Sequence, residues 1–163
     1  MRLYFLRHAD ADAATRWTDA ERPLSTIGVE QATAVAEAMR SMETAVGTIF
    51  SSPLLRAKQT AEIVGRQFPS VKIQTLEQLR PDSEPEGLLR ELQSMPRDTR
   101  ALIVSHEPFV SRCIGRLIST GGEQYISIKK ASLACVEVGL PVQRGSGVLL
   151  WLMTNEILRL ITR

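Results

Sequence analysis

The chain has 163 residues, 44% of them apolar, so it is long enough to bury the core of one domain. Its 20 basic and 18 acidic side chains leave a formal net charge of +2, too small by itself to indicate nucleic-acid or membrane binding. No apolar run approaches the roughly 20 residues that span a bilayer, and the amino terminus has no signal-peptide core. We therefore expect one cytoplasmic domain that covers residues 1–163.

Short apolar runs alternate with longer segments of helical periodicity, which is typical of an α/β fold with a largely parallel sheet. The expected fold class is a three-layer sandwich, with a mostly parallel central sheet flanked by helices. Strands are predicted at residues 3–6, 46–50, 71–76, 101–104, 133–138, 148–153 and 157–161. The last three could be antiparallel strands at the edge of the same sheet.

The helices are predicted from apolar stripes and from residues that favour a helix start. Ser25 or Thr26 is expected to cap the first helix, and residues 9–23 before it form a polar loop. Ser52 is predicted as the N-cap of the second helix, with Pro53 at its first position. Further helices are expected at residues 86–94 and after residue 108.

Arginine and histidine side chains follow three of the predicted strands, close to where each strand ends. Arg7 and His8 follow the first strand, Arg56 lies in the first turn after the second, and His106 follows residues 101–104. In open α/β sheets, ligands bind in the crevice outside the carboxyl ends of the strands. The chain has only two histidines, and both occupy such ends, so we expect these four side chains to converge.

Two arginines, two histidines and a helix amino terminus form a site suited to a phosphate dianion. His8 must be unprotonated to attack phosphorus, and neighbouring cations lower its pKa. Arg7 and Arg56 would hold the phosphoryl oxygens, and His106 would help to stabilise their charge in the transition state. Taken singly, each residue also has a structural explanation, as a solvated arginine or a hydrogen-bonded histidine.

The same residues resemble the histidine phosphatase superfamily, which also contains the cofactor-dependent phosphoglycerate mutases. The resemblance covers most of the chain and rests on Leu6-Arg7-His8, Arg22-Pro23-Leu24-Ser25 with Gly28, Ser51-Ser52-Pro53-Leu54-Leu55-Arg56-Ala57-Lys58-Gln59-Thr60 and Ser105-His106-Glu107-Pro108. It is similar to the SixA branch of small phosphohistidine phosphatases. The resemblance implies a phosphoglycerate mutase-like fold, with His8 as nucleophile and a phosphate pocket of Arg7, Arg56 and His106.

The stretch Glu77-Gln78-Leu79-Arg80-Pro81-Asp82 departs from the family pattern, because many relatives carry a glutamate general acid there, beside a tryptophan and a glycine. Phosphohistidine has a good leaving group and needs less help from a proton donor, so this absence favours a phosphoramidate substrate. Asp82, Asp10 and Glu107 are candidate donors, or ordinary loop and helix-start carboxylates. Arg22 could contact the substrate or pair with a carboxylate such as Glu21.

No metal or other cofactor is expected, because the two histidines lack metal-ligand spacing. Cys113 and Cys135 are expected as buried thiols, and Lys129-Lys130 as a solvated strand end. The expected partner is a phosphorylated protein, such as a histidine phosphotransfer domain, or a small phosphate ester, and neither nucleic acid nor a membrane. A non-catalytic phosphate-binding module is the alternative from another class.

Overall fold

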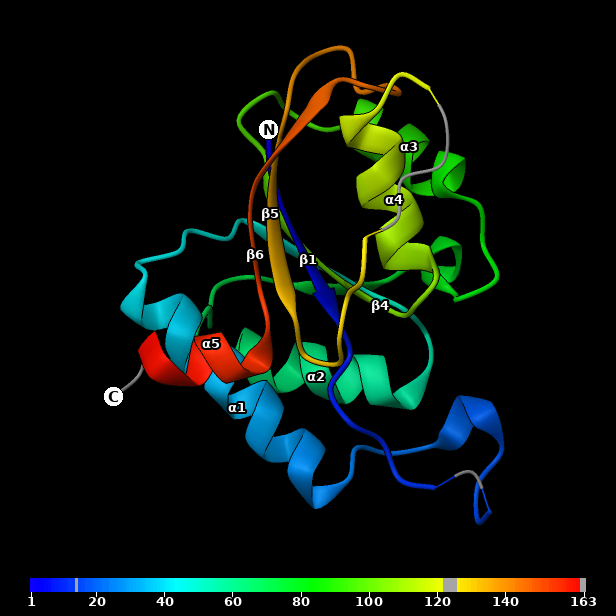
Figure 1. Ribbon diagram of the computed structural model, residues 1–163, viewed down its shortest axis with the longest axis vertical. Coiled ribbons are helices and arrows are strands. Elements are labelled where there is room, and N and C mark those ends of the chain that lie inside the picture. The colour runs from blue at the N-terminus through cyan, green and yellow to red at the C-terminus, as the bar shows by residue number, and fades with distance from the viewer. Residues whose placement is uncertain (14, 122–125, 162–163) are drawn as a thin grey trace.

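The computed structural model describes residues 1–13, 15–121 and 126–161, and strands and helices alternate along most of that length (Figure 1). No helix in these described ranges is long and apolar enough to cross a membrane. The elements follow in the order β1 (Arg2–Arg7), η1 (Asp19–Glu21), α1 (Thr26–Ser41), β2 (Thr48–Ser51), α2 (Leu55–Gly65), β3 (Ile73–Thr75), η2 (Glu77–Leu79), α3 (Pro85–Gln93), β4 (Arg100–Ser105), α4 (Phe109–Ile118), β5 (Leu133–Val138), β6 (Gly147–Met153) and α5 (Asn155–Ile161).

The strands of the described chain form a six-stranded sheet in the order β3-β2-β4-β1-β5-β6. β3, β2, β4 and β1 run parallel to one another, whereas β5 and β6 are antiparallel. This topology confirms the mostly parallel sheet and the antiparallel strands predicted at 133–138 and 148–153. It also places the carboxyl ends of β1, β2 and β4 at the same edge of the sheet.

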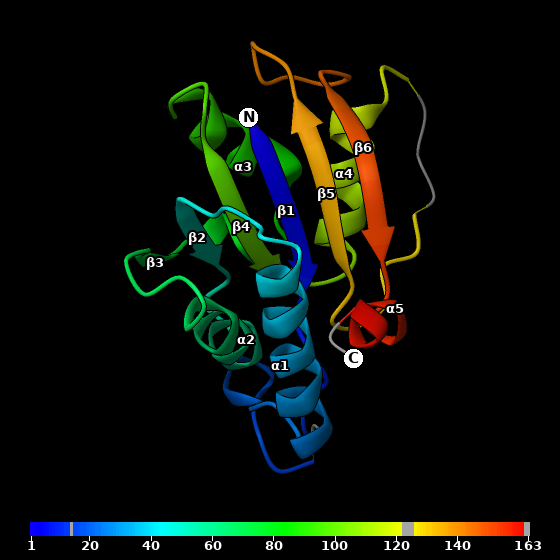
Figure 2. The same cartoon turned by 90° about the vertical axis from the view of Figure 1, so that its left-hand side faces the viewer.

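Helices cover both faces of this sheet, so the fold is the predicted three-layer sandwich. Figure 2 shows α1, α2 and α5 on one face and α3 and α4 on the other. Each face has its own apolar cluster, with Phe5 and Phe109 in one and Leu6 and Met39 in the other. Successive residues of β1 therefore pack into the apolar clusters on opposite faces of the sheet, which explains why the interior of the strand is apolar.

The carboxy-terminal segment differs from its prediction. Residues 157–161 are predicted as a strand but belong to α5, which packs against α1. Leu158 is fully buried, and the Asn155 side-chain amide donates to the carbonyl of Gln31 (3.1 Å). A short apolar run satisfies both a strand and a buried helix, so periodicity alone does not distinguish them.

The start of α2 also differs from its prediction. The helix begins at Leu55, with Leu54 at the N-cap, rather than at Pro53 after a Ser52 cap. The Ser52 hydroxyl lies 2.8 Å from Nε2 of His106. Ser52 is therefore engaged with a side chain 54 residues away in the sequence, which no local helix-start pattern encodes.

Of the two predicted caps, Ser25 is the N-cap of α1 and Thr26 is its first residue, and this helix start brings two backbones into close contact. Ser25 Oγ accepts a hydrogen bond from the amide of Gly28 (3.0 Å), and the Ser25 amide donates to the carbonyl of Asp10 (3.1 Å). A Cβ atom on Gly28 would lie only 1.9 Å from that carbonyl oxygen. Only glycine fits here without a movement of the loop that follows β1.

We expect Gly28→Ala to lower the free energy of unfolding by about 1–3 kcal/mol, because the new methyl group must push the backbone away. Chemical denaturation of both proteins measures the difference. Gly47→Ala is the matched control, since its Cβ would meet the Arg100 carbonyl at 3.6 Å, an ordinary contact. Equal stabilities of the two variants would contradict the close approach at Gly28.

Candidate active site

The carboxyl ends of β1 and β4 place the two histidines next to each other. Arg7 pairs with Ser105 across the parallel strands, and the His8 amide donates to the Ser105 carbonyl (2.8 Å). The ring centroids of His8 and His106 are 4.8 Å apart. Both rings are buried, with 7% and 2% of their residue surface exposed. The strand register thus joins residues that lie almost 100 positions apart.

Hydrogen bonds define which nitrogen of His8 carries the proton. Nδ1 lies 2.7 Å from the carbonyl oxygen of Ala9, and a carbonyl only accepts, so Nδ1 is the protonated nitrogen. Arg56 Nε donates to His8 Nε2 (3.3 Å), which requires a lone pair on Nε2. His8 therefore presents an unprotonated Nε2 to its cationic neighbour, the arrangement that a nucleophilic histidine needs.

The environment of His8 lowers its pKa to about 4. Burial is the largest cause, because it disfavours the imidazolium cation. The hydrogen bond to Ala9 acts in the opposite direction, and the charges of Arg56, Arg7 and Lys130 lower the pKa further. The sequence predicts only the effect of neighbouring cations, whereas burial depends on the complete fold.

The pKa of His106 is lowered as well, to about 2, by burial first and by the charge of His8 next.

We expect neither histidine ring to titrate between pH 8 and pH 5.5 in the folded protein, and NMR of the two imidazole Cε1–H signals measures this directly. Unfolded histidines take up protons near pH 6.5, so stability should be complete above pH 6.5 and fall as the pH drops toward 4. A ring that titrates near pH 6.5 would contradict the buried, neutral pair.

Two further buried nitrogens lack partners in this cluster. Arg7 Nη1 donates to the Ile128 carbonyl (2.7 Å), but nothing in the described residues bonds Arg7 Nε or His106 Nδ1. The Ser52 hydroxyl can donate to His106 Nε2, which leaves the proton of the neutral ring on Nδ1. Unpaired donors are costly in a buried site unless they serve a ligand, and phosphate oxygens are suitable acceptors.

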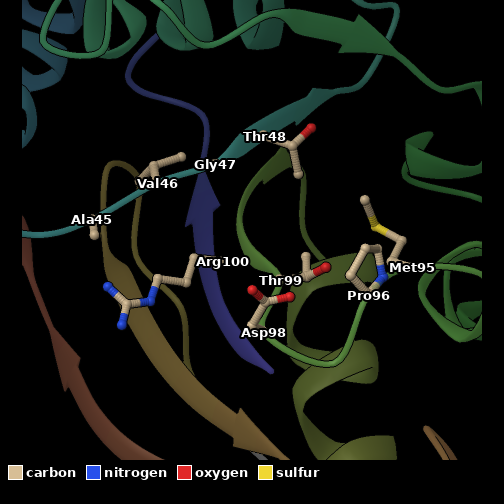
Figure 3. Close-up of a pocket in the computed structure, with 9 residues that line it drawn as sticks. All are labelled: Ala45, Val46, Gly47, Thr48, Met95, Pro96, Asp98, Thr99 and Arg100. Atoms are coloured by element: carbon tan, nitrogen blue, oxygen red, sulfur yellow. The ribbon is translucent and has the colours of Figure 1, made fainter.

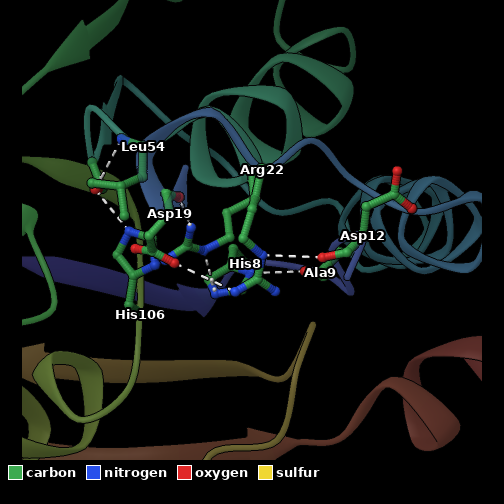
Figure 4. Close-up of polar contacts among 9 residues, drawn as sticks. His8, Ala9, Asp12, Asp19, Arg22, Leu54 and His106 are labelled. Atoms are coloured by element: carbon green, nitrogen blue, oxygen red, sulfur yellow. Dashed lines mark hydrogen bonds and ion pairs between the residues drawn. The ribbon is translucent and has the colours of Figure 1, made fainter. Parts of the chain in front are cut away.

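The guanidinium of Arg56 is buried, and its two terminal nitrogens are hydrogen-bonded to Asp19. Nη1 donates to the Asp19 carbonyl (2.6 Å), and Nη2 donates to the Asp19 carboxylate (3.1 Å). Arg22 Nη1 reaches the other oxygen of the same carboxylate (3.4 Å), and its Nε donates to the Asp12 carbonyl (3.0 Å). Figure 4 shows Asp19 and Arg22 gathered with the two histidines. Arg22 therefore pairs with a carboxylate, that of Asp19 rather than of Glu21.

Asp10 is engaged in a structural contact. Its carboxylate accepts hydrogen bonds from Lys130 (2.5 Å) and from the Ser25 hydroxyl (2.6 Å). Burial raises the pKa of Asp10, but these hydrogen bonds and the Lys130 charge outweigh it and hold the pKa below its usual value. The carboxyl is thus ionised and unsuited to donate a proton. Lys130 is exposed, as predicted for a solvated residue before β5, but its amine also pairs with Asp10 in the loop after β1.

The other two candidate acids differ in their surroundings. Asp82 is exposed in the turn before α3, and no hydrogen bond or ion pair of its carboxylate is found within the described chain. Glu107 is half-buried beside His106 and accepts a hydrogen bond from the Ser111 amide (3.2 Å). Burial raises the pKa of Glu107. Of the candidate acids predicted from the sequence, Glu107 is the one whose surroundings favour a protonated carboxyl.

A pocket at the opposite end of the sheet is separate from this cluster. It is lined by residues at the starts of β2 and β4, among them Thr48, Asp98 and Arg100 (Figure 3). None of the site residues predicted from the sequence lines it. Because ligands of open α/β sheets bind outside the carboxyl ends of the strands, the histidine cluster is the candidate active site.

Metal-type side chains do not gather elsewhere in the described ranges. No three His, Cys, Asp or Glu side chains there form a group that could hold a metal ion. Cys113 and Cys135 are buried and unbonded to each other, as predicted.

Comparison with known proteins gives a consistent family. Residues 3–81 match the model of the histidine phosphatase superfamily (branch 1). Phosphohistidine phosphatase SixA of Escherichia coli (strain K12) is 29% identical over 160 residues, which cover 94% of each chain. An uncharacterized protein of Picosynechococcus sp. is 30% identical over 142 residues, 85% of this chain and 86% of that protein.

A solved structure of the protein histidine phosphatase SixA complexed with tungstate superimposes with a TM-score of 0.83 at 26% identity. The alignment covers 95% of this chain and 97% of that one. The three-layer sandwich is thus the phosphoglycerate mutase-like fold, and the similarities extend beyond the matched residues 3–81 to nearly the whole chain. The chain belongs to the histidine phosphatase superfamily (branch 1), and it is similar to SixA over nearly its whole length.

Proposed function

We propose that this phosphatase hydrolyses phosphohistidine on a protein, with His8 as the nucleophile and residues 1–163 acting as one domain. The observation that carries the proposal is the state of His8 Nε2. Its ring proton is held at Nδ1 by the Ala9 carbonyl, and Arg56 donates to Nε2, so the lone pair lies beside a phosphate-binding guanidinium. Similarity to SixA along nearly the whole chain supports the choice of substrate.

The proposed reaction has two displacements at phosphorus. In the first, His8 Nε2 forms a bond to phosphorus while the bond between phosphorus and the substrate's imidazole nitrogen breaks, and the departing ring takes up a proton. In the second, water attacks the phosphorylated His8, which releases inorganic phosphate and restores the free base. Arg56, Arg7 Nε and His106 Nδ1 would donate to the three phosphoryl oxygens, whose charge the transition state spreads.

We propose phosphohistidine as the substrate because the site has no well-placed proton donor among Asp10 and Asp82. Asp10 is ionised through its contact with Lys130, and Asp82 is exposed, so neither suits the protonation of a poor leaving group. An imidazole leaving group needs little such help. The phosphohistidine would be carried by a phosphorylated protein, such as a histidine phosphotransfer domain.

A small phosphate ester is the second candidate, and Glu107 favours it. An ester leaves as an alkoxide and requires a general acid, and the raised pKa of the half-buried Glu107 carboxyl would suit that role. Glu107→Gln should then abolish ester hydrolysis while sparing phosphohistidine hydrolysis.

A panel of substrates tests the proposed function. Phosphohistidine on a phosphotransfer domain, sugar phosphates and an activated aryl phosphate would be compared by kcat/KM, with a chelator present throughout. We expect phosphohistidine to be hydrolysed with at least tenfold greater kcat/KM than the sugar phosphates. Faster turnover of a sugar phosphate would assign the protein to ester hydrolysis, and loss of activity on chelation would contradict a metal-free site.

A further inference from the structure

The contacts of Asp19 divide the nitrogens of Arg56 into two groups. Nη1 and Nη2, on the outer edge of the guanidinium, both bind Asp19, through its carbonyl (2.6 Å) and its carboxylate (3.1 Å). Nε, on the inner edge, points at His8 Nε2 (3.3 Å). Because a guanidinium is planar and rigid, hydrogen bonds that hold Nη1 and Nη2 also fix the direction in which Nε points.

Hydrophobic packing does not explain why Asp19 lies there. All three residues of η1 are exposed, and the Asp19 side chain itself is 63% exposed, whereas that of Arg56 is 7% exposed. The segment therefore meets the buried site through polar contacts. Arg22 holds the same carboxylate from the other side (3.4 Å) and is itself tied to the Asp12 carbonyl.

The Asp19 carboxylate is charged in this arrangement. Partial burial raises its pKa, but the hydrogen bond and charge of Arg56, with the charge of Arg22, outweigh that effect and lower it. The carboxylate is thus unsuited to be a proton donor. Its contacts instead lie on the side of Arg56 that faces away from His8.

We propose that Asp19 is a positioning residue, which holds the outer edge of the Arg56 guanidinium so that the inner edge faces the phosphoryl group on His8 Nε2. This inference rests on the proposed function, because it requires Arg56 to bind the transferred phosphoryl oxygens. Misplacement of a group by about 1 Å can cost as much as a hundredfold in rate. The Asp19 carboxylate is largely exposed, and its backbone carbonyl would still bind Arg56 Nη1 in an alanine variant, so removal of the carboxylate should cost little stability. Asp19 should therefore affect turnover more than folding.

Asp19→Ala tests the proposal through kcat, oxyanion binding and thermal stability together. We expect kcat to fall about tenfold with the melting temperature unchanged. Tungstate, used as the oxyanion probe in calorimetry, should bind no more weakly, because the charge of Arg56 remains and a negative charge has gone. Asp19→Asn keeps an oxygen acceptor for Nη2 and should recover most of kcat.

Asp12→Ala is the matched control, since it removes a carboxylate from the same loop that has no partner among the described residues. We expect it to retain the kcat of the unaltered protein. A kcat of Asp19→Ala within twofold of the unaltered protein, an equal loss in Asp12→Ala, or weaker tungstate binding would each overturn the positioning role.

Arg56→Ala separates failure of this inference from failure of the proposed function. If Arg56→Ala lowers kcat and Asp19→Ala does not, only the role of Asp19 is wrong. If Arg56→Ala leaves kcat unchanged, the phosphate pocket itself is wrong and the role of Asp19 falls with it.

Discussion

Replacing His8 with alanine is expected to lower kcat by at least about 10⁴-fold, because the variant has no group that can accept the phosphoryl group. The neighbouring His106 does not take over, since its Nε2 is engaged with the Ser52 hydroxyl (2.8 Å). Steady-state kinetics with a phosphohistidine protein measures the loss. Full turnover by His8→Ala would exclude the proposed nucleophile.

His106→Ala is the comparison that separates the two histidines. It removes a donor to the phosphoryl oxygens and leaves the nucleophile in place, so a smaller loss of about 10²–10³-fold is expected. Both variants empty a buried site, so their melting temperatures need to be measured beside their rates. His8→Asn keeps a polar side chain at this position and removes the nucleophile. An equal loss of activity in a folded His8→Asn protein would show that the loss is not caused by unfolding.

Replacing Arg56 with alanine is expected to lower kcat by about 10²–10³-fold, the usual effect of removing one donor that stabilises transition-state charge. The guanidinium is buried, and its Nε lies 3.3 Å from the attacking nitrogen of His8, so no other side chain replaces it. The same substitution should raise the pKa of His8, because the Arg56 charge helps to lower it.

The controls for Arg56 are chosen to separate charge from geometry. Arg56→Lys keeps the charge and loses the planar fork, so its kcat should lie between those of the alanine variant and the unaltered protein. Arg66→Ala removes an exposed arginine next to the end of the same helix and should leave kcat unchanged. A rate for Arg56→Ala equal to that of Arg66→Ala would remove Arg56 from the pocket.

The sequence predicts most of the fold because its strands are short, apolar and followed by amphipathic helices. It also brings His8 and His106 to one edge of the sheet, since residues that follow parallel strands share that edge. Local sequence patterns do not show which strands are neighbours in the sheet. The parallel pairing of β1 with β4 determines the 4.8 Å separation of the two rings, and that pairing depends on the whole topology.

The features missed from the sequence depend on contacts between distant residues. Ser52 fits a helix cap by local pattern, but its hydroxyl is used by His106 in the fold. Lys130 pairs with Asp10 across 120 positions, and Asp19 with Arg56 across 37. Charged residues in polar loops are usually solvated, so nothing in the local sequence distinguishes these pairs from ordinary surface side chains.

The role of burial at His8 was likewise visible only in the fold. Arginines beside a histidine predict a lowered pKa, yet burial contributes more than their charges do. In the fold, the His106 ring that follows β4 lies against the His8 ring, and Arg56 from the first turn of α2 reaches its Nε2. A neutral nucleophile in this protein is therefore a property of the packed sheet as well as of the motif.

Direct detection of the phosphorylated intermediate tests whether His8 is the nucleophile. The protein would be mixed with a phosphodonor, quenched within the first turnover and mapped by mass spectrometry at neutral and high pH. We expect a phosphoryl group on His8 that is labile in acid and stable in base, and that is absent in His8→Ala. An adduct on another residue, or rapid turnover with no adduct on His8, would contradict it.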